Sequence, residues 1–141
     1  MTKILVVDDD EDYLHIIMWQ LRPFFQVWGV STLAEAIKVF AGNGFRAVLL
    51  DIGLRDSVSE RTVREMKDKY PNCAIVVLSG NEDPNRIKQC ISDSASSYLV
   101  KGRDDKDSSI MVAAINSAIA NNDVCRKADH VQKVIDNECE I

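Results

Sequence analysis

Short aliphatic runs alternate with amphipathic segments along most of the chain. The runs are rich in Val, Leu and Ile, as expected of strands that are buried on both faces of a parallel sheet. They occupy residues 4–7, 24–30, 45–50, 73–78 and 98–100, and the second is the least regular. After each run, apolar residues recur every three or four positions, which is typical of a helix that packs on a sheet. The pattern predicts an α/β fold with five parallel strands, right-handed crossovers and helices on both faces.

Capping signals mark the expected starts of the helices. Side-chain oxygens of Asp, Ser and Thr accept hydrogen bonds from free N–H groups in a first turn, and a Glu three residues later completes a capping box. Proline and glycine stop a helix. The expected starts are the acids after residue 7, the capping boxes Thr32–Glu35 and Ser57–Glu60, Asp83 with Pro84, and the region of Asp107; the expected stops include Pro23, Gly42 and Pro71.

Polar residues follow four of the five aliphatic runs. Asp8 and Asp9 come after the first run and Asp51 after the third, while Ser79 follows the fourth and Lys101 the fifth. A doubly wound sheet of strand order 2-1-3-4-5 places strands one, three, four and five side by side. We therefore expect these side chains to converge on one crevice at the carboxyl edge of the sheet.

The expected set of groups suits phosphoryl transfer. Three carboxylates make an oxygen-rich site of the kind that binds Mg²⁺. One carboxylate can attack phosphorus while the metal ion, a hydroxyl and an ammonium neutralise charge on the phosphoryl oxygens. Each residue also has a structural explanation, because Asp8, Asp9 and Asp51 could be caps, Ser79 a turn residue and Lys101 a solvated strand end. Their joint occurrence at four strand ends favours the functional interpretation.

Composition excludes several classes of function. A net charge of −5 argues against nucleic acid as a partner, because phosphate contacts need clustered Lys and Arg. Four cysteines without paired spacing predict free thiols in a reducing compartment rather than disulfides or a zinc site. No apolar run reaches the length of a membrane span, and the first residues lack the layout of a signal peptide. We expect a cytoplasmic protein that binds neither nucleic acid nor membrane.

At this point the chain resembles the receiver domains of two-component response regulators. The resemblance extends roughly from Lys3 to Asn121, and its four motifs together are highly specific. The matching motifs are Val7-Asp8-Asp9, Leu49-Leu50-Asp51-Ile52-Gly53-Leu54, Val77-Leu78-Ser79-Gly80 and Tyr98-Leu99-Val100-Lys101. The resemblance implies a flavodoxin-like fold with a (βα)₅ arrangement. It also implies that Asp51 accepts a phosphoryl group from a histidine kinase or a histidine phosphotransfer protein.

The resemblance further assigns a role to each residue of the site. It implies that Asp9, Asp51 and the backbone carbonyl of Gly53 bind Mg²⁺ directly and that Asp8 acts mainly through water. Ser79 and Lys101 would contact the aspartyl phosphate. Tyr98 matches the aromatic residue that turns inward when the hydroxyl residue moves; the alternative is a half-buried strand tyrosine. Partner binding would then change on the surface formed by the fourth helix, fifth strand and fifth helix.

Three positions depart from the family pattern. Arg55 and Gly102 stand where the family usually has proline, and Ser59 stands where it usually has the glycine that opens the next helix. The loop after Asp51 should therefore be constrained differently. A cis peptide bond before a residue other than proline costs roughly 2.5–4 kcal/mol. We therefore predict a trans Lys101–Gly102 bond, with the conformational freedom of glycine accommodating the turn.

Domain organisation is predicted as a receiver at residues 1–122 and a tail at residues 123–141. The tail is too short for an effector domain, so the readout would be a downstream target protein, onward transfer of phosphate or a homodimer. Its apolar residues are spaced four, three and four positions apart, as on one face of a helix. The helix could continue the fifth one or restart after Asn121–Asp123. The apolar residues are Val124, Ala128, Val131 and Ile135.

Two alternative functions remain open at this stage. The Asp-x-Asp pattern of Asp8 and Asp10 is that of haloacid-dehalogenase-like phosphatases, but Glu11 and Asp12 follow where that family has a small residue and then Thr or Val. That reading also leaves Asp51 without a role. A receiver-like binding module that is never phosphorylated is disfavoured, because every expected site residue is present.

Overall fold

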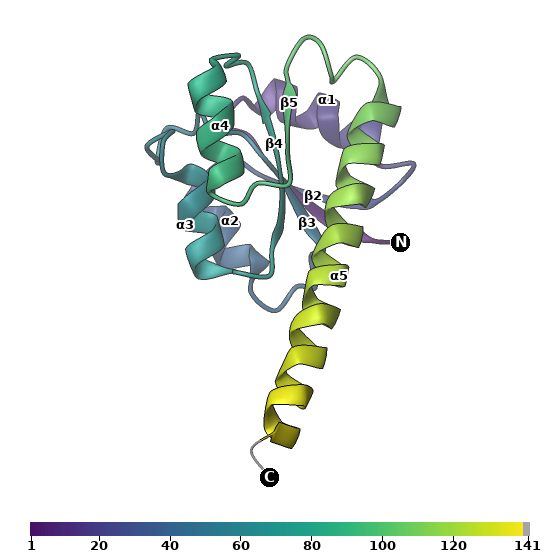
Figure 1. Cartoon of the computed structure of the whole chain (residues 1–141). Coiled ribbons are helices and arrows are strands. Elements are labelled where there is room, and N and C mark those ends of the chain that lie inside the picture. Colours follow the sequence, from purple (N-terminus) through teal and green to yellow (C-terminus); the bar gives the residue numbers. More distant parts are fainter. Residues whose placement is uncertain (140–141) are drawn as a thin grey trace.

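Five parallel strands in the order β2-β1-β3-β4-β5 form the centre of the molecule, and five helices alternate with them along the chain (Figure 1). This is the predicted doubly wound, flavodoxin-like topology. The computed structural model describes residues 1–139, and their side chains as far as Asp123. The strands are β1 (Lys3–Val7), β2 (Gln26–Val30), β3 (Ala47–Leu50), β4 (Ala74–Ser79) and β5 (Ser97–Val100). The helices are α1 (Glu11–Leu21), α2 (Leu33–Phe40), α3 (Thr62–Lys69), α4 (Pro84–Ser92) and α5 (Ser108–Cys139).

Two apolar cores lie on the two faces of the sheet. Successive strand residues point to opposite faces, so the nearly continuous aliphatic runs fill both cores. One core joins the sheet to α2, α3 and α4, and the other joins it to α1 and α5. Each fully buried aliphatic side chain stabilises the fold by roughly 1.5–3 kcal/mol. The largest fully buried strand residues of the first core are Leu5, Leu50 and Ile75, and those of the second are Ile4 and Leu49.

Most of the predicted helix caps are present. The side chain of Asp10 caps α1 by accepting a hydrogen bond from the Tyr13 N–H, and Thr32 caps α2 in the same way. Asp83 caps α4, with Pro84 in the first turn. These contacts are local in the sequence, which is why the residue pattern predicts them.

The start of α3 differs from the prediction. The expected capping box Ser57–Glu60 is absent, and the helix begins later, at Thr62, with no side-chain cap. The carboxylate of Glu60 instead lies 2.7 Å from the guanidinium of Arg86 on α4. The Glu60 carboxylate thus pairs with a neighbouring helix and does not cap its own. The Ser57 hydroxyl contacts the Thr62 hydroxyl at 2.9 Å.

Helix α5 continues without a break through residues 121–123, where its expected course was undecided. Asp123 lies 2.5 Å from Arg46 beside β3, and the Asn122 side chain donates to the carbonyl of Asn72 at 2.7 Å. These polar side chains anchor the helix to the amino edge of the sheet. Beyond them the helix extends away from the domain (Figure 1). The apolar tail residues lie outside the described side chains, so the boundary at residue 123 and the apolar face stay predictions.

Two further predictions concern the backbone and the thiols. Among the described residues every peptide bond is trans, and Gly102 has φ +83°, a conformation that glycine adopts without strain. Cys73 and Cys90 are buried and free, and burial raises the pKa of the Cys73 thiol to about 12.

None of the helices in residues 1–139 is long and apolar enough to cross a membrane.

Candidate functional site

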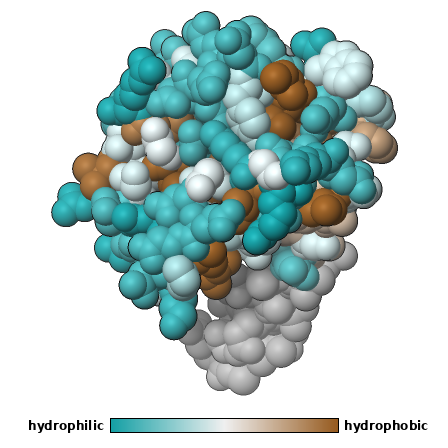
Figure 2. Space-filling model, turned by 90° about the horizontal axis from the view of Figure 1, so that it is seen from above, coloured by the Kyte–Doolittle hydropathy of each residue, from teal (hydrophilic) through white to brown (hydrophobic). Residues whose placement is uncertain are grey.

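Three carboxylates gather at the carboxyl edge of the sheet, as the sequence predicts. Val7 and Leu50 are partners in the register of β1 and β3, so the residues that follow them, Asp8 and Asp51, leave the sheet side by side. The Asp51 N–H donates to the Val7 carbonyl at 3.0 Å. One oxygen each of Asp8, Asp9 and Asp51 can be chosen so that all three lie within 4.8 Å of one another. Figure 2 looks onto this edge and shows a mainly hydrophilic surface.

Asp51 is buried, and its two oxygens have different surroundings. Only 6% of the residue is exposed. Oδ1 accepts the Gly53 N–H at 3.0 Å, and Oδ2 faces the Lys101 ammonium at 3.4 Å. Burial raises the pKa of Asp51 above its ordinary value, and the charge of Asp8 adds to this, although the Gly53 N–H and Lys101 oppose it. The carboxylate is therefore poorly solvated, and Oδ2 is the oxygen on the cationic side.

Lys101 supplies the positive charge of the site. Its ammonium lies 2.7 Å from Asp8 Oδ2 and 3.4 Å from Asp51 Oδ2, and the residue follows β5 directly. The Lys101 N–H donates to the Ser79 carbonyl at 3.0 Å, which ties the ends of β4 and β5 together. Burial lowers the pKa of Lys101, but the hydrogen bond to Asp8 and the two carboxylate charges outweigh it and leave the pKa above its ordinary value. The amine of Lys101 therefore keeps its positive charge.

Asp9 lies at the rim of the site and is partly exposed. Its Oδ2 accepts the backbone N–H of Arg55 at 3.1 Å. The Arg55 guanidinium is 3.8 Å from the same oxygen, and 91% of the side chain is exposed. Arg55 therefore supports Asp9 mainly through its backbone, and its side chain is in contact with solvent.

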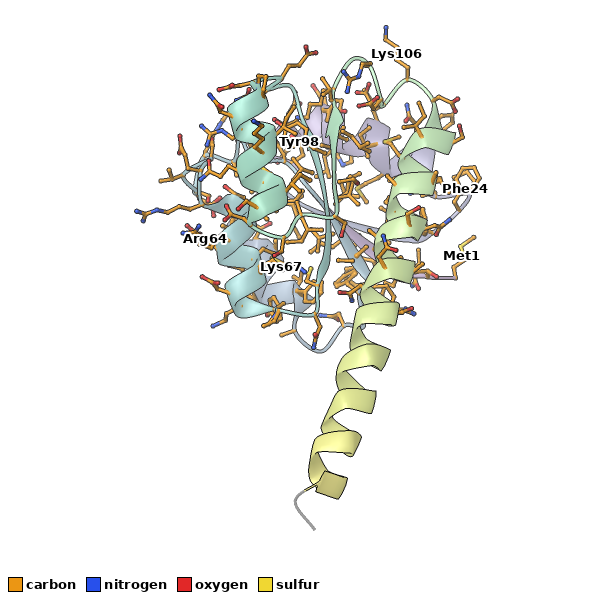
Figure 3. The ribbon with its side chains drawn as sticks, in the orientation of Figure 1. Met1, Phe24, Arg64, Lys67, Tyr98 and Lys106 are labelled. Atoms are coloured by element: carbon orange, nitrogen blue, oxygen red, sulfur yellow. The ribbon has the colours of Figure 1, made fainter. Side chains whose placement is uncertain are left out.

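Ser79 and Tyr98 meet the same residue of the β4–α4 loop. Ser79 is buried at the end of β4, and its hydroxyl accepts the Asn81 N–H at 3.2 Å. The half-buried Tyr98 donates its hydroxyl to the Asn81 carbonyl at 2.6 Å. Burial raises the pKa of Tyr98, so this hydroxyl stays protonated. Figure 3 shows Tyr98 on β5 beside α4. Asn81 thus links the Ser79 hydroxyl to the Tyr98 side chain.

The donor set fits a divalent cation. Three carboxylates share one buried ammonium, and the Arg55 guanidinium near Asp9 is exposed to solvent, so acidic groups outnumber buried cations in the cluster. Oxygen ligands of this kind suit a hard divalent ion. The acidic group of Asp8, Asp9 and Asp51 can therefore hold such an ion. Asp10 lies outside this group, since it is exposed and caps α1.

Sequence reasoning missed two residues next to the site. The Tyr13 hydroxyl donates to Asp105 Oδ2 at 2.5 Å, and the Lys101 ammonium lies 4.5 Å from the centre of the Tyr13 ring. Burial raises the pKa of Tyr13, and the contact with Asp105 raises it further, so the hydroxyl remains a donor. The available signals were an aromatic residue in the first turn of α1 and an acid shortly after Gly102. Neither signal is specific without the fold, because the two residues are 92 positions apart.

Comparison with known proteins agrees with this geometry. The model of the response regulator receiver domain family matches residues 4–116. The photosynthetic apparatus regulatory protein RegA of Rhodovulum sulfidophilum is 26% identical over 106 residues, which cover 74% of this chain and 58% of that protein. This chain thus spans less than two thirds of its curated relative.

Solved structures share the fold. A response regulator receiver domain protein from Clostridium thermocellum has a TM-score of 0.78 and 26% identity, over 89% of this chain and 99% of that one. A response regulator from Burkholderia pseudomallei, solved with a phosphorylated aspartic acid, a calcium ion and citrate, has a TM-score of 0.72 and 21% identity, over 98% of this chain and 86% of that one. The chain belongs to the response regulator receiver domain family of two-component signalling.

Proposed function

We propose that this chain is a phosphorylatable switch and that Asp51 accepts the phosphoryl group. The donor would be a phosphohistidine of a histidine kinase or of a histidine phosphotransfer protein. The observation that carries the proposal is the buried Asp51 carboxylate, which lies in one acidic group with Asp8 and Asp9 and 3.4 Å from the Lys101 ammonium. The Burkholderia relative, which has the same fold and a phosphorylated aspartic acid, supports it.

The surroundings of Asp51 support a direct transfer. We assign Oδ2 as the nucleophile, because Oδ1 is held by the Gly53 N–H. The bond from Oδ2 to phosphorus forms as the bond from phosphorus to the histidine nitrogen breaks, and the nitrogen leaves with the electron pair. The Lys101 ammonium, 3.4 Å from Oδ2, would face a phosphoryl oxygen and offset its charge. The Ser79 hydroxyl would donate to another phosphoryl oxygen.

Mg²⁺ is the cation that we propose for the acidic group. Bound there, it would supply positive charge that lowers the repulsion between the carboxylates and an incoming phosphoryl group. Asp9, Asp51 and the carbonyl of Gly53 would hold it directly, and Asp8 through water. The contacts of Asp8 support this division. Its Oδ1 accepts the Asp10 N–H at 2.9 Å, and its Oδ2 forms the shorter ion pair with Lys101, at 2.7 Å against 3.4 Å for Asp51.

Readout would pass through Ser79 and Tyr98 to the surface of α4, β5 and α5. Movement of Ser79 toward the phosphoryl group would disturb its bond to Asn81, the residue that also holds the Tyr98 hydroxyl. The surface carries exposed apolar residues, Ile91 on α4 and Ile110 on α5. We propose that a downstream target protein or a second copy of the chain binds there, and the tail helix is a further candidate for contact between copies.

Intact-mass measurement after incubation with acetyl phosphate and Mg²⁺ tests the proposal. We expect one phosphoryl adduct, abolished by Asp51→Asn and by EDTA. Asp10→Asn is the matched control, because asparagine is an equally good helix cap and Asp10 lies outside the acidic group. The adduct should persist in this variant. An adduct that survives Asp51→Asn but disappears in Asp8→Asn would favour the phosphatase alternative, and the absence of any adduct would favour a binding module.

A further inference from the structure

The loop after β5 has no proline to restrain it. It begins with a trans Lys101–Gly102 bond, and Gly102 has φ +83°. Glycine at this position leaves the backbone conformationally free, so the direction of the Lys101 side chain depends on other contacts. Two acids of the same loop provide them. Asp104 Oδ2 accepts the Val100 N–H at 2.8 Å, which folds the loop back on the end of the strand.

Asp105 connects this loop to α1. Its Oδ1 accepts the Gly102 N–H at 2.8 Å, and its Oδ2 accepts the Tyr13 hydroxyl at 2.5 Å. One carboxylate therefore joins the residue next to Lys101 to a side chain of another element. Tyr13 is itself placed by the cap of α1, where its N–H donates to Asp10 Oδ1 at 3.2 Å. The chain of contacts runs from the start of α1 to the residue that follows the catalytic lysine.

The Tyr13 ring also contacts the lysine directly. The Lys101 ammonium lies 4.5 Å from the ring centre, within the range of a cation–π interaction. The face of an aromatic ring attracts a cation electrostatically, and this attraction depends less on direction than a hydrogen bond does. The ammonium has three donors, of which two are directed to Asp8 and Asp51. We expect the third to reach a phosphoryl oxygen.

We propose that Tyr13 and Asp105 are positioning residues for phosphoryl transfer. Together with the Gly102 N–H they form a brace that holds the Lys101 ammonium against the carboxylates. The brace would replace the restraint that a proline at position 102 would place on the backbone. The inference rests on the proposed function of Asp51. It concerns residues of this chain that lie outside the motifs of the family pattern.

The rate of phosphorylation by acetyl phosphate at saturating Mg²⁺ tests the brace. Tyr13→Phe keeps the ring but removes the hydrogen bond to Asp105, and we expect about a threefold slower reaction. Tyr13→Leu also removes the ring, and we expect about a tenfold slower reaction. Asp105→Ala removes this bond and also the acceptor of the Gly102 N–H, so its reaction should be at least as slow as that of Tyr13→Phe. Tyr70→Phe is the matched control, because it removes a hydroxyl that donates to Ile37 away from the site, and its rate should be unchanged.

A second measurement separates positioning from a general effect on structure. In a Lys101→Met background, Tyr13→Leu should cause no further loss of rate, because the group that it positions is absent. An equal loss in both backgrounds overturns the inference. Mg²⁺ affinity, measured by titration, should be the same in Tyr13→Phe and in the wild type, since the three carboxylates are intact.

NMR of the Lys101 side chain gives a readout that does not depend on phosphorylation. Because the Lys101 Nζ lies 4.5 Å from the centre of the Tyr13 ring, the adjacent ε-methylene protons should be shifted upfield in the wild type, and Tyr13→Leu should remove the shift. Unchanged signals overturn the brace. A wild-type chain that takes no phosphoryl group at Asp51 overturns the proposed function and the inference with it. A Tyr13→Leu variant that reacts at the wild-type rate overturns the inference alone.

Discussion

Lys101 forms its shorter ion pair with Asp8, at 2.7 Å, and not with Asp51, at 3.4 Å. The ammonium is thus shared between the two most buried carboxylates of the site. One buried cation does not compensate the acidic group, and the remaining repulsion lies partly in a poorly solvated cluster. Without a bound cation, the acidic group therefore lowers the stability of the fold.

Asp51→Asn should relieve this cost. We expect the variant to be more stable than the wild type in EDTA at pH 7, by on the order of 1 kcal/mol, because one buried charge is removed while the shape is kept. Mg²⁺ should raise the midpoint of thermal unfolding of the wild type by more than that of the variant. Thermal unfolding by circular dichroism measures both effects. A variant that is less stable than the wild type in EDTA would show that Lys101 already compensates the cluster.

Gly102 should tolerate no side chain. Its φ of +83° is strained for any other residue, so we expect Gly102→Ala to lower the free energy of unfolding by about 1 kcal/mol. Gly102→Pro should cost more, because the ring requires a negative φ and the N–H that donates to Asp105 is lost. Gly80→Ala is the control, since a Cβ there meets nothing within 4 Å and φ is not positive. Urea unfolding compares the three, and equal stability of the Gly102 and Gly80 alanine variants would contradict the prediction.

Asp56 should stabilise the fold above about pH 4 through the start of α2. Burial alone would raise the pKa of Asp56, but the N–H groups of Leu33 and Ala34, at 2.9 and 3.0 Å, outweigh it and lower the pKa. A carboxyl with a lowered pKa in the folded state contributes stability above its unfolded value of 3.8, and this is lost as the pH falls through the folded value.

Asp56→Ala should therefore lower the free energy of unfolding by about 1 kcal/mol at pH 7, the usual cost of losing a cap. The difference from the wild type should shrink below pH 4, when Asp56 becomes protonated. Chemical unfolding at a series of pH values measures it. Asp68→Ala, on the exposed side of α3, is the control. A difference that is constant from pH 7 to pH 3 would rule out a charged cap.

The topology could be predicted because its signals are local and repeated. The aliphatic runs give the strands, and Asp10, Thr32 and Asp83 each cap a helix through contacts with residues two or three positions away. The convergence of Asp8 and Asp51 then follows from the strand order alone. The chemical roles of the site residues depend on the family resemblance and remain predictions.

What could not be predicted depends on contacts between distant residues. The start of α3 was misplaced because Glu60 pairs with Arg86, 26 positions away, and not with its own helix. The contact of Tyr13 with Asp105 spans 92 positions. The sequence around Glu60 or Tyr13 contains no signal for such a partner, because each residue could equally lie on a solvated face of a helix. Only the folded chain shows which acids cap a helix, which gather at the carboxyl edge of the sheet and which pair with a distant residue.

Arg86 should limit the motion of α4 before phosphorylation. Its side chain is 17% exposed and its guanidinium lies 2.7 Å from Glu60 Oε1. The Gln89 side chain donates to the Glu60 carbonyl at 2.9 Å. Both contacts tie α4 to the loop between Asp51 and α3. Arg86→Met keeps much of the apolar stem but removes the charge and its donors. We expect the amides of α4 to exchange up to about fivefold faster in the unphosphorylated variant. This is the size of effect expected when one partly exposed ion pair is lost.

Hydrogen exchange followed by mass spectrometry measures this effect with and without acetyl phosphate. In the wild type, phosphorylation should change exchange in α4, β5 and α5 together. In Arg86→Met the change in α4 should be smaller, because part of the restraint is already lost. Arg103→Met is the matched control, since it removes an ion pair with Asp104 within the β5–α5 loop. Faster α4 exchange in both variants, or changes confined to β2, would show that the Glu60–Arg86 contact does not restrain the switch.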